Sequence, residues 1–360
     1  MKIALILPTL QGGGAEKVYI NIGEYFKYKL EHEFDIIIFK DLIDYETSLN
    51  VINVLSKNEK ITKNLLKFLK NLYKILKNYD IIISGLELEP NYIAILYSKI
   101  LKKPCICTHH SQISKLIDFE HKKKKFLYQF LNILTLRFAN MNIAVSKEAY
   151  YDIMKNYKIP KEKCMYIYNP IDLEKVRNLA NESIEKEYEF IFRNKTLCFV
   201  GRLQEYKGLK KVIKALKYLE SYNLIVLGKG NFEAYNKHLE ELNLKDRVFY
   251  LGFKRNPYKY INKCFALVLP SEFEGFGLVF YEAMALGIPI VGSGIKETFG
   301  ENNEYGIYAN SVEEIISAIK TLENPEIYEH YRRIGLERVK NFKLEKIAKQ
   351  YEEVILKILT

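Results

Sequence analysis

Two cations follow a buried, strand-like run in the second half of the chain, at a spacing suited to a diphosphate. Arg202 and Lys207 stand five residues apart, just after the apolar run Thr196–Val200. A guanidinium fork and a point charge near backbone amides are the groups that bind a diphosphate. Two solvated surface cations are the ordinary alternative on a basic protein, and the spacing alone leaves both interpretations open.

A pair of glutamates forms the most specific pattern in the chain. Glu274 lies in a glycine-rich segment after a strand-like run, and Glu282 follows eight residues later in a helical pattern. Carboxylates accept hydrogen bonds from pairs of hydroxyl groups, and Gly275 and Gly277 let helix-start amides approach an anion. Glutamate pairs are usually solvated, but the apolar, glycine-rich surroundings of this pair favour a binding site.

A third segment, near the N-terminus, is rich in glycine. Gly12, Gly13 and Gly14 follow the apolar run Ile3–Pro8 and precede a helical pattern. Such a turn allows a ligand to approach the backbone, and a helix N-terminus there favours an anion. A plain tight turn is the alternative, because the spacing of the dinucleotide-binding fingerprint is absent.

These segments are positioned by two sets of continuous apolar runs separated by helical patterns. Strands that are apolar on both faces predict a parallel sheet covered by helices on both sides. We therefore expect an α/β protein of two Rossmann-like, doubly wound domains facing across a cleft, with ligands at the carboxyl ends of the strands. We place the domains at residues 1–170 and 171–341, with a C-terminal helix over 342–360 and a polar, loop-like linker reaching to about Asn194. The runs are Ile3–Pro8, Phe34–Phe39, Asp80–Ser84, Pro104–Thr108 and Met141–Val145, then Thr196–Val200, Asn223–Leu227, Val248–Leu251, Ala266–Leu269 and Pro289–Val291.

Taken together, the motifs resemble the retaining nucleotide-sugar glycosyltransferases of family four (group 1), which have the GT-B fold. The resemblance runs from near residue 10 to near residue 295, and the two glutamates eight residues apart are its most specific part. One departure concerns Ser293, which stands where the family usually has a glycine before Glu297. The segments that carry the resemblance are Gly12–Glu16, Val200–Gly208, Pro270–Met284 and Gly287–Val291.

The resemblance implies a role for each candidate residue. Arg202 and Lys207 would hold the donor diphosphate, Glu282 the ribose hydroxyls and Glu274 the hydroxyls of the donor sugar. In the first domain, His109 and His110 resemble a strand-end histidine that points at the sugar; the match favours His110, and a capping or core histidine is the ordinary alternative. The implied catalytic residues are His110, Glu274, Arg202 and Lys207, and the implied donor-binding residues also include Gly13, Gly14, His109, Arg247, Gly275, Phe276, Gly277 and Glu282.

The resemblance also implies a reaction. A hexose or N-acetylhexosamine would move, with retention, from a nucleotide diphosphate sugar, which we expect to be UDP-linked, to a lipid-linked or cell-surface glycan. We expect no metal and no cofactor, because cations and helix amides would stabilise the leaving group and the sequence has no Asp-x-Asp. A nucleotide-sugar 2-epimerase on the same fold and a non-catalytic sugar- or lipid-binding module are the alternatives. The last helix would cross back to the first domain, so deleting residues 343–360 should abolish activity.

The net charge indicates an anionic partner for the first half of the chain. The 360 residues carry a net charge of +11, of which residues 1–180 carry +9 and residues 181–360 carry +2. Such asymmetry is typical of proteins that bind a membrane surface or nucleic acid. We expect no nucleic-acid partner, because the sequence lacks the aromatic and arginine-rich motifs of RNA-binding proteins.

The lysines of the first half instead favour an anionic membrane. Five of them recur at helical spacing within an apolar segment, which predicts a basic amphipathic helix, although a solvated lysine face is the ordinary alternative. No apolar run approaches the roughly 18 residues that a membrane span needs, and five scattered cysteines indicate a reducing compartment. We therefore expect a cytoplasmic protein, peripheral on the inner face of the membrane. The expected membrane-contacting residues are Lys63, Lys67, Lys70, Lys74, Lys77, Lys122, Lys123, Lys124 and Lys125.

Overall fold

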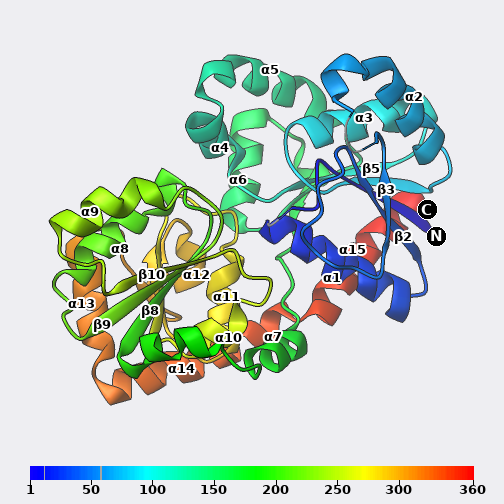
Figure 1. The fold of residues 1–360 in the computed structure, drawn as a ribbon. Helices are drawn as coiled ribbons and strands as arrows, with labels where there is room; N and C mark the ends of the chain where they lie inside the picture. Colours follow the sequence, from blue (N-terminus) through cyan, green and yellow to red (C-terminus); the bar gives the residue numbers. More distant parts are fainter. Residues whose placement is uncertain (12, 57–58) are drawn as a thin grey trace. The chain divides into compact units, whose positions relative to one another are not determined.

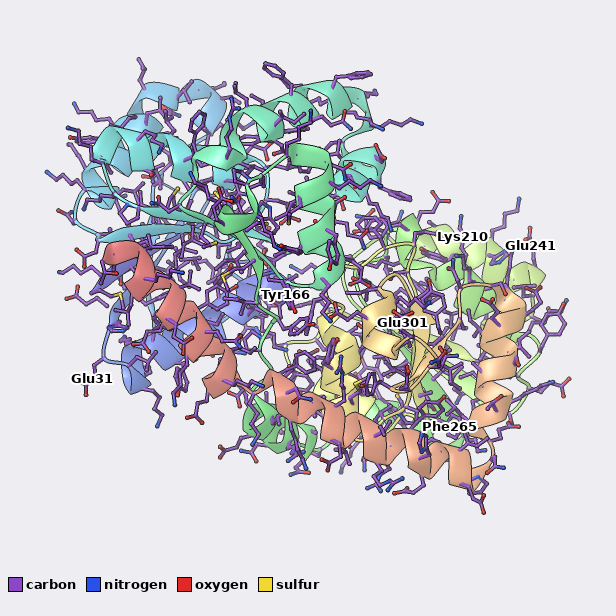
Figure 2. The ribbon with its side chains drawn as sticks, turned by 180° about the vertical axis from the view of Figure 1, so that it is seen from behind. Glu31, Tyr166, Lys210, Glu241, Phe265 and Glu301 are labelled. Carbon is purple, nitrogen blue, oxygen red and sulfur yellow. The ribbon has the colours of Figure 1, made fainter. Side chains whose placement is uncertain are left out.

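The computed structural model describes residues 1–11, 13–56 and 59–360, so Gly12 of the glycine-rich segment lies outside the described residues. The chain divides into two compact units, each of which is described by itself (Figure 1). Unit 1 comprises Met1–Pro170 and Leu344–Thr360, and unit 2 comprises Ile171–Lys343. Side chains occupy the space between the helices and the sheet of each unit (Figure 2).

Unit 1 is built on a parallel sheet of seven strands in the order β3-β2-β1-β4-β5-β6-β7. The direction in which strands are added reverses between β1 and β4, which are neighbours in the sheet. In open α/β sheets, ligands bind beyond the carboxyl ends of the strands at such a reversal. The strands are β1 (Lys2–Leu7), β2 (Glu33–Ile38), β3 (Asn50–Asn53), β4 (Ile81–Ser84), β5 (Cys105–His109), β6 (Met141–Ala144) and β7 (Cys164–Tyr166).

Helices cover both faces of the unit 1 sheet. On one face, α1 packs against the C-terminal helix α15 and against β2. On the other face, buried side chains of α2 to α6 join one apolar cluster with residues of the sheet. The helices are α1 (Gly14–Lys29), α2 (Leu65–Leu76), α3 (Glu89–Leu101), α4 (Ile113–Glu120), α5 (Lys125–Thr135), α6 (Lys147–Tyr157) and α15 (Leu344–Leu359), with short 3₁₀ segments η1 (Ile61–Lys63), η2 (Lys122–Lys124), η3 (Leu136–Phe138) and η4 (Lys161–Lys163).

Unit 2 repeats the architecture with six parallel strands in the order β10-β9-β8-β11-β12-β13. Its strands are β8 (Lys195–Val200), β9 (Tyr222–Leu227), β10 (Val248–Gly252), β11 (Ala266–Pro270), β12 (Ile290–Ser293) and β13 (Ile307–Tyr308). Its helices are α7 (Leu173–Ala180), α8 (Leu209–Leu216), α9 (Asn236–Glu241), α10 (Tyr258–Ile261), α11 (Leu278–Ala285), α12 (Lys296–Phe299), α13 (Val312–Leu322) and α14 (Pro325–Arg338), with 3₁₀ segments η5 (Lys186–Arg193), η6 (Glu205–Lys207), η7 (Glu233–Tyr235) and η8 (Val339–Phe342). Two doubly wound parallel sheets confirm the predicted fold class.

The predicted linker is wrong in one respect, because the segment after Pro170 is not a loop. It forms α7, whose first turn is capped by Asp172: the carboxylate accepts a hydrogen bond from the backbone N–H of Lys175 at 3.0 Å. Val176 and Ala180 are buried, and α7 packs on α10 and α11. The helix escaped the sequence analysis because the segment is mostly polar. The helical signal in the sequence is the spacing of four residues between these two apolar side chains.

Among the described residues, no helix is long and apolar enough to cross a membrane. All five cysteines are buried and none forms a disulfide.

Candidate active site

The two cations of unit 2 lie beyond the carboxyl end of β8, a central strand of its sheet. Arg202 is exposed, and its guanidinium donates a hydrogen bond to the hydroxyl of Tyr206 at 3.1 Å. Lys207 ends η6, and Gly208 follows with φ +78°. A Cβ at Gly208 would come within 2.4 Å of the Pro270 carbonyl oxygen, so this turn requires glycine.

The structure brings Lys207 and Glu274 into direct contact. Lys207 Nζ lies 2.7 Å from Glu274 Oε1, and the two side chains are only 14% and 10% exposed. The hydroxyl of Ser271, a buried residue directly after β11, donates to the same oxygen at 2.7 Å. The carboxylate predicted to face the sugar and a cation predicted to face the diphosphate are thus neighbours at one edge of the sheet.

The glycine-rich segment after Glu274 leads into α11. Gly277 has φ +72° and caps the helix, while Gly275, Phe276 and Gly277 are all buried. The ring of Phe276 stacks on that of Tyr281, with centroids 4.3 Å apart. Because this stacking fixes the side chain away from solvent, Phe276 can present only its backbone to a ligand.

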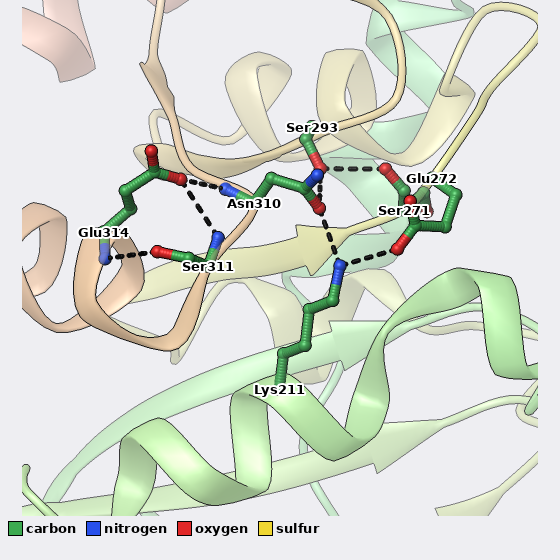
Figure 3. A network of polar contacts seen from close by, with 7 residues as sticks. All are labelled: Lys211, Ser271, Glu272, Ser293, Asn310, Ser311 and Glu314. Carbon is green, nitrogen blue, oxygen red and sulfur yellow. Dashed lines mark hydrogen bonds and ion pairs between the residues drawn. The ribbon is translucent and has the colours of Figure 1, made fainter.

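A polar network behind this segment holds it against the neighbouring strands (Figure 3). Lys211 Nζ donates to Glu272 Oε1 at 2.6 Å and to Asn310 Oδ1 at 2.8 Å. Ser293, where the family usually has a glycine, donates through its hydroxyl to the carbonyl of Ser271 at 2.8 Å. The serine therefore ties β12 to the segment that carries Glu274.

Glu282 is buried in α11 and is held by a tyrosine. The hydroxyl of Tyr258, in α10, donates a hydrogen bond to Glu282 Oε1 at 2.8 Å, and Tyr258 is itself buried. A buried carboxylate in a fixed orientation can accept hydrogen bonds from a pair of ligand hydroxyls.

The expectation that Arg247 lines the donor site is wrong. Arg247 directly precedes β10, at the amino edge of a parallel sheet, whereas Arg202 and Lys207 lie beyond the carboxyl edge. Its guanidinium donates to the backbone carbonyls of Tyr222 at 2.8 Å and of Leu216, the last residue of α8, at 2.9 Å. Arg247 therefore caps a helix C-terminus and joins it to the start of β9.

In unit 1, the two histidines occupy different environments. His109 ends β5 and is fully buried, with Nε2 3.1 Å from Asn142 Oδ1. His110 is partly exposed, with Nε2 3.2 Å from the hydroxyl of Tyr19 and the two rings edge to face. Only His110 offers accessible surface to a ligand at the carboxyl edge, where it lies next to the reversal point of the sheet.

Gly13 and Gly14 lie beyond β1 at the same edge. Gly13 caps α1, and its carbonyl accepts a hydrogen bond from the hydroxyl of Tyr45 at 3.1 Å. A Cβ at Gly13 would come within 2.1 Å of the Glu16 carboxylate, so this side chain lies against the turn.

Several residues of these sites escaped the sequence analysis. Glu87 follows β4, is 9% exposed, and accepts hydrogen bonds from the backbone N–H of His110 at 3.1 Å and from the hydroxyl of Ser111. Burial raises the pKa of its carboxyl group. Like Ser271, which lies in the segment Pro270–Met284 that the sequence analysis selected, Glu87 is a polar residue just past a strand, and that position is the signal by which Glu87 could have been found.

The nine lysines expected at a membrane fall into two groups. The five of the predicted basic helix are exposed on or beside α2, whose Phe68, Leu72 and Leu76 are buried in unit 1. The four others, Lys122–Lys125, span η2 and the first residue of α5; three are exposed and Lys125 is half-buried beside Asp118.

His109 and His110 predict a pH dependence of stability. Burial lowers the pKa of His109 to about 4, and burial followed by the neighbouring His109 lowers that of His110 to about 3. Between about pH 4 and 6.5 both are neutral when folded but protonated when unfolded. The free energy of unfolding should therefore decrease as the pH falls below about 6.5, by roughly 1.4 kcal/mol per pH unit for each histidine.

Urea denaturation followed by circular dichroism between pH 4.5 and 7.5 measures this slope. The raised pKa of Glu87 affects the slope in the opposite direction above about pH 4.5. Because Glu87 is present in both the wild type and His110→Gln, the difference between their two slopes isolates the contribution of His110. The dependence of the unfolding free energy on pH should be weaker in the variant, by about the contribution of one histidine. Identical slopes would mean that His110 is protonated in the folded protein.

Within the described ranges, no cluster of three or more His, Cys, Asp or Glu residues is arranged to hold a metal ion.

Two family models match the chain. The model described as "Glycosyltransferase Family 4" matches residues 12–175, and the model described as "Glycosyl transferases group 1" matches residues 181–338. Together the two matches include strands β2 to β13 and all the candidate site residues named above, Arg247 among them.

Similar proteins cover most or nearly all of the chain. A Campylobacter jejuni protein named N-acetylgalactosamine-N,N'-diacetylbacillosaminyl-diphospho-undecaprenol 4-alpha-N-acetylgalactosaminyltransferase is 29% identical over 371 aligned residues, which cover 99% of each chain. The Escherichia coli O-antigen biosynthesis glycosyltransferase WclY is 27% identical and covers 82% of this chain and 80% of its own. Among solved structures, HepE from Anabaena, in complex with UDP and glucose, superposes with a TM-score of 0.82 at 22% identity over 99% of each chain.

Proposed function

Because the chain belongs to the group 1 glycosyltransferases and has their GT-B fold, we propose that it transfers a hexose or N-acetylhexosamine, with retention, from a UDP-linked donor to a lipid-linked or cell-surface glycan. The names of the relatives support the acceptor, since the C. jejuni protein acts on a diphospho-undecaprenol-linked glycan and WclY acts in O-antigen biosynthesis. HepE, solved with UDP and glucose, supports the donor class.

The observation that carries the proposal is the contact between Lys207 and Glu274 beside Arg202. A donor diphosphate placed here meets two cations, while its sugar meets a carboxylate that accepts hydrogen bonds from hydroxyl groups. When the sugar leaves, negative charge develops on the diphosphate, and these fixed cations stabilise it. A neutral His110 can exchange hydrogen bonds with a sugar hydroxyl without adding charge.

The same cations support a reaction that needs no metal, because Arg202 and Lys207 can neutralise the leaving group directly. Transfer should therefore continue at the same rate, within about twofold, after dialysis against EDTA. A rate restored only by Mg²⁺ or Mn²⁺ would overturn this part of the proposal.

The exposed lysines of α2 and η2 support a peripheral position on the inner face of an anionic membrane, where each cation near the surface contributes about 1 kcal/mol. A lipid-linked acceptor is found at that surface.

The test is transfer by the purified protein from a panel of UDP- and GDP-linked sugars into a membrane extract, with Glu274→Gln alongside. A lipid-extractable product from one donor, absent with the variant, is the expected result. NMR of the product's anomeric centre then reports retention. An epimerised nucleotide sugar, or no consumption of any donor, would contradict the proposal.

Tyr258→Phe tests the proposed ribose contact of Glu282. Loss of the hydroxyl removes the hydrogen bond that orients the buried carboxylate, so UDP should bind about five- to tenfold more weakly, as measured by calorimetry. With 2′,3′-dideoxy-UDP, which lacks the hydroxyls, wild type and variant should bind equally. An equal loss for both ligands would mean that Tyr258 acts on the fold and not on Glu282.

A further inference from the structure

Helix α5 of unit 1 has its polar and apolar faces reversed relative to an ordinary surface helix. Phe126 is 85% exposed and Phe130 63% exposed, and three further aliphatic side chains of the helix are also exposed: Leu127, Ile133 and Leu134. The buried positions of the helix are Tyr128 and Asn132. Residues 126–136 contain no charged side chain.

The buried side of α5 is held by polar contacts. Tyr128 donates its hydroxyl to Glu89 Oε1 at 2.5 Å, and Asn132 Oδ1 accepts from the hydroxyl of Tyr92 at 2.8 Å. Both partners are on α3. These contacts fix the rotation of α5, so its apolar side is directed outward by the fold.

Cations lie at both ends of this apolar face. Lys122–Lys125 precede it, and Arg137 follows it beside the exposed Phe138, whose ring lies 5.3 Å from the guanidinium carbon. Phe119 of α4, which packs against α5, is also exposed. An apolar, aromatic face with basic ends is the arrangement of helices that lie in a membrane interface, where the cations reach the lipid headgroups.

We propose that α5 is the element that penetrates the membrane: the face formed by Phe126, Leu127, Phe130, Ile133 and Leu134 inserts among the acyl chains of an anionic bilayer, with Lys122–Lys125 and Arg137 at the headgroups. The inference rests on the proposed function in that it names the partner surface on which the acceptor is carried. It differs from adsorption through α2, whose Phe68, Leu72 and Leu76 are buried in the protein. The exposed residues of α2 are three lysines and three apolar or aromatic side chains, Leu65, Leu66 and Tyr73, whereas the exposed apolar face of α5 carries no charge.

Charge favours a bilayer over a second copy of the chain. In a symmetric pairing of two α5 helices, each apolar face would bring its own basic ends against those of its partner. Anionic lipid headgroups instead pair with the cations at both ends.

The α2 helix covers the same face of the sheet as α5. The two helices are connected through α3, where the hydroxyl of Tyr97 donates to the carbonyl of Leu69, in α2, at 2.6 Å. The lysines of α2 therefore add electrostatic attraction to an anionic bilayer on the same side of unit 1 as α5.

The placement of α5 also links the membrane to the candidate site of unit 1. Tyr128, near the start of α5, is bonded to Glu89, the first residue of α3, and α3 begins just past the carboxyl end of β4. That is the edge at which His110 lies. A lipid-linked substrate in the same bilayer is thereby presented near this edge of the sheet.

The chain contains no tryptophan, so one introduced tryptophan reports its own surroundings. In full-length Phe130→Trp, phosphatidylglycerol–phosphatidylethanolamine vesicles should shift the emission to the blue, and lipids brominated in the acyl chain should quench it. In the matched control Tyr218→Trp, at an exposed position of unit 2, neither change should occur. Phe126→Ser combined with Phe130→Ser should weaken vesicle binding about tenfold or more while leaving UDP affinity unchanged.

Each contrary outcome is distinct. Co-sedimentation without quenching would mean adsorption by charge alone and would overturn the inference. A blue shift that occurs without vesicles and grows with protein concentration would show that α5 contacts a second copy of the chain, and this would overturn the inference. If the lipids quench the tryptophan but the protein transfers no sugar, the proposed function is overturned and the membrane inference stands. If the protein transfers sugar to a detergent-dispersed acceptor but the lipids do not quench the tryptophan, the membrane inference is overturned and the proposed function stands.

Discussion

Replacing Lys207 with alanine should reduce kcat/KM for sugar transfer by roughly 10³-fold, since one charge-stabilising group at a reacting centre typically contributes a factor of that size. Lys207 Nζ lies 2.7 Å from Glu274 Oε1, and its side chain is only 14% exposed. Little water is present to replace it when charge develops on the leaving diphosphate. Initial rates with a saturating and a limiting donor separate the loss in kcat from that in KM.

The matched control is Lys210→Ala, which removes an exposed lysine three residues further on (labelled in Figure 2) and should change the rate less than about twofold. Lys207→Arg should restore part of the activity, because a guanidinium keeps the charge but not the compact geometry of the ammonium. Thermal unfolding of each variant tests whether loss of the partner of Glu274 also destabilises unit 2. A Lys207→Ala protein with more than a tenth of the wild-type rate would show that other groups neutralise the diphosphate.

The central strands of both sheets were predictable because they are apolar on both faces. Strands β3, β7 and β13 were not, since they are short, lie at sheet edges and have at most one buried residue each. Their sequences therefore lack the continuous apolar run by which the other strands, including the edge strand β10, were found. Helix α7 was not predicted either, because the charged residues on its exposed face made the segment resemble a polar loop.

The candidate site was predictable where residues follow a strand, as Arg202 and Lys207 do. The same rule explains the error at Arg247. This residue precedes β10, and a residue that precedes a strand of a parallel sheet lies at the amino edge, opposite the edge where Arg202 and Lys207 lie. The reversed faces of α5 were beyond prediction. Periodicity locates two faces of a helix, but it assigns the apolar one to the core, and here Tyr128 and Asn132 are buried instead.

Deleting residues 343–360 should abolish activity by unfolding unit 1. Helix α15 is the last segment of the chain, yet it belongs to unit 1, where Ile347, Tyr351, Val354 and Ile355 are buried against α1. Burying four such side chains contributes about 6–12 kcal/mol. A typical domain has a net stability of roughly 5–15 kcal/mol, so the loss is comparable to the whole. Hydrogen exchange of the unit 1 strands would report the unfolding.

A second consequence of the deletion concerns the site itself. Tyr351 lies next to Tyr19 in the core, and burial followed by this neighbour raises the pKa of Tyr19 well above its ordinary value. The Tyr19 hydroxyl is in turn 3.2 Å from His110 Nε2. Helix α15 therefore supports the tyrosine against which the candidate histidine is placed.

Point variants separate these two effects of α15. Tyr351→Ala should cost about 3–5 kcal/mol of stability through the cavity it leaves and should lower kcat even at temperatures where the protein stays folded, because Tyr19 can then move away from His110. Tyr351→Phe keeps the ring and should change kcat little. Removing only residues 357–360, whose side chains are exposed or half-buried, should leave both stability and activity intact. A fully active protein lacking all of 343–360 would show that unit 1 folds and positions His110 without its last helix.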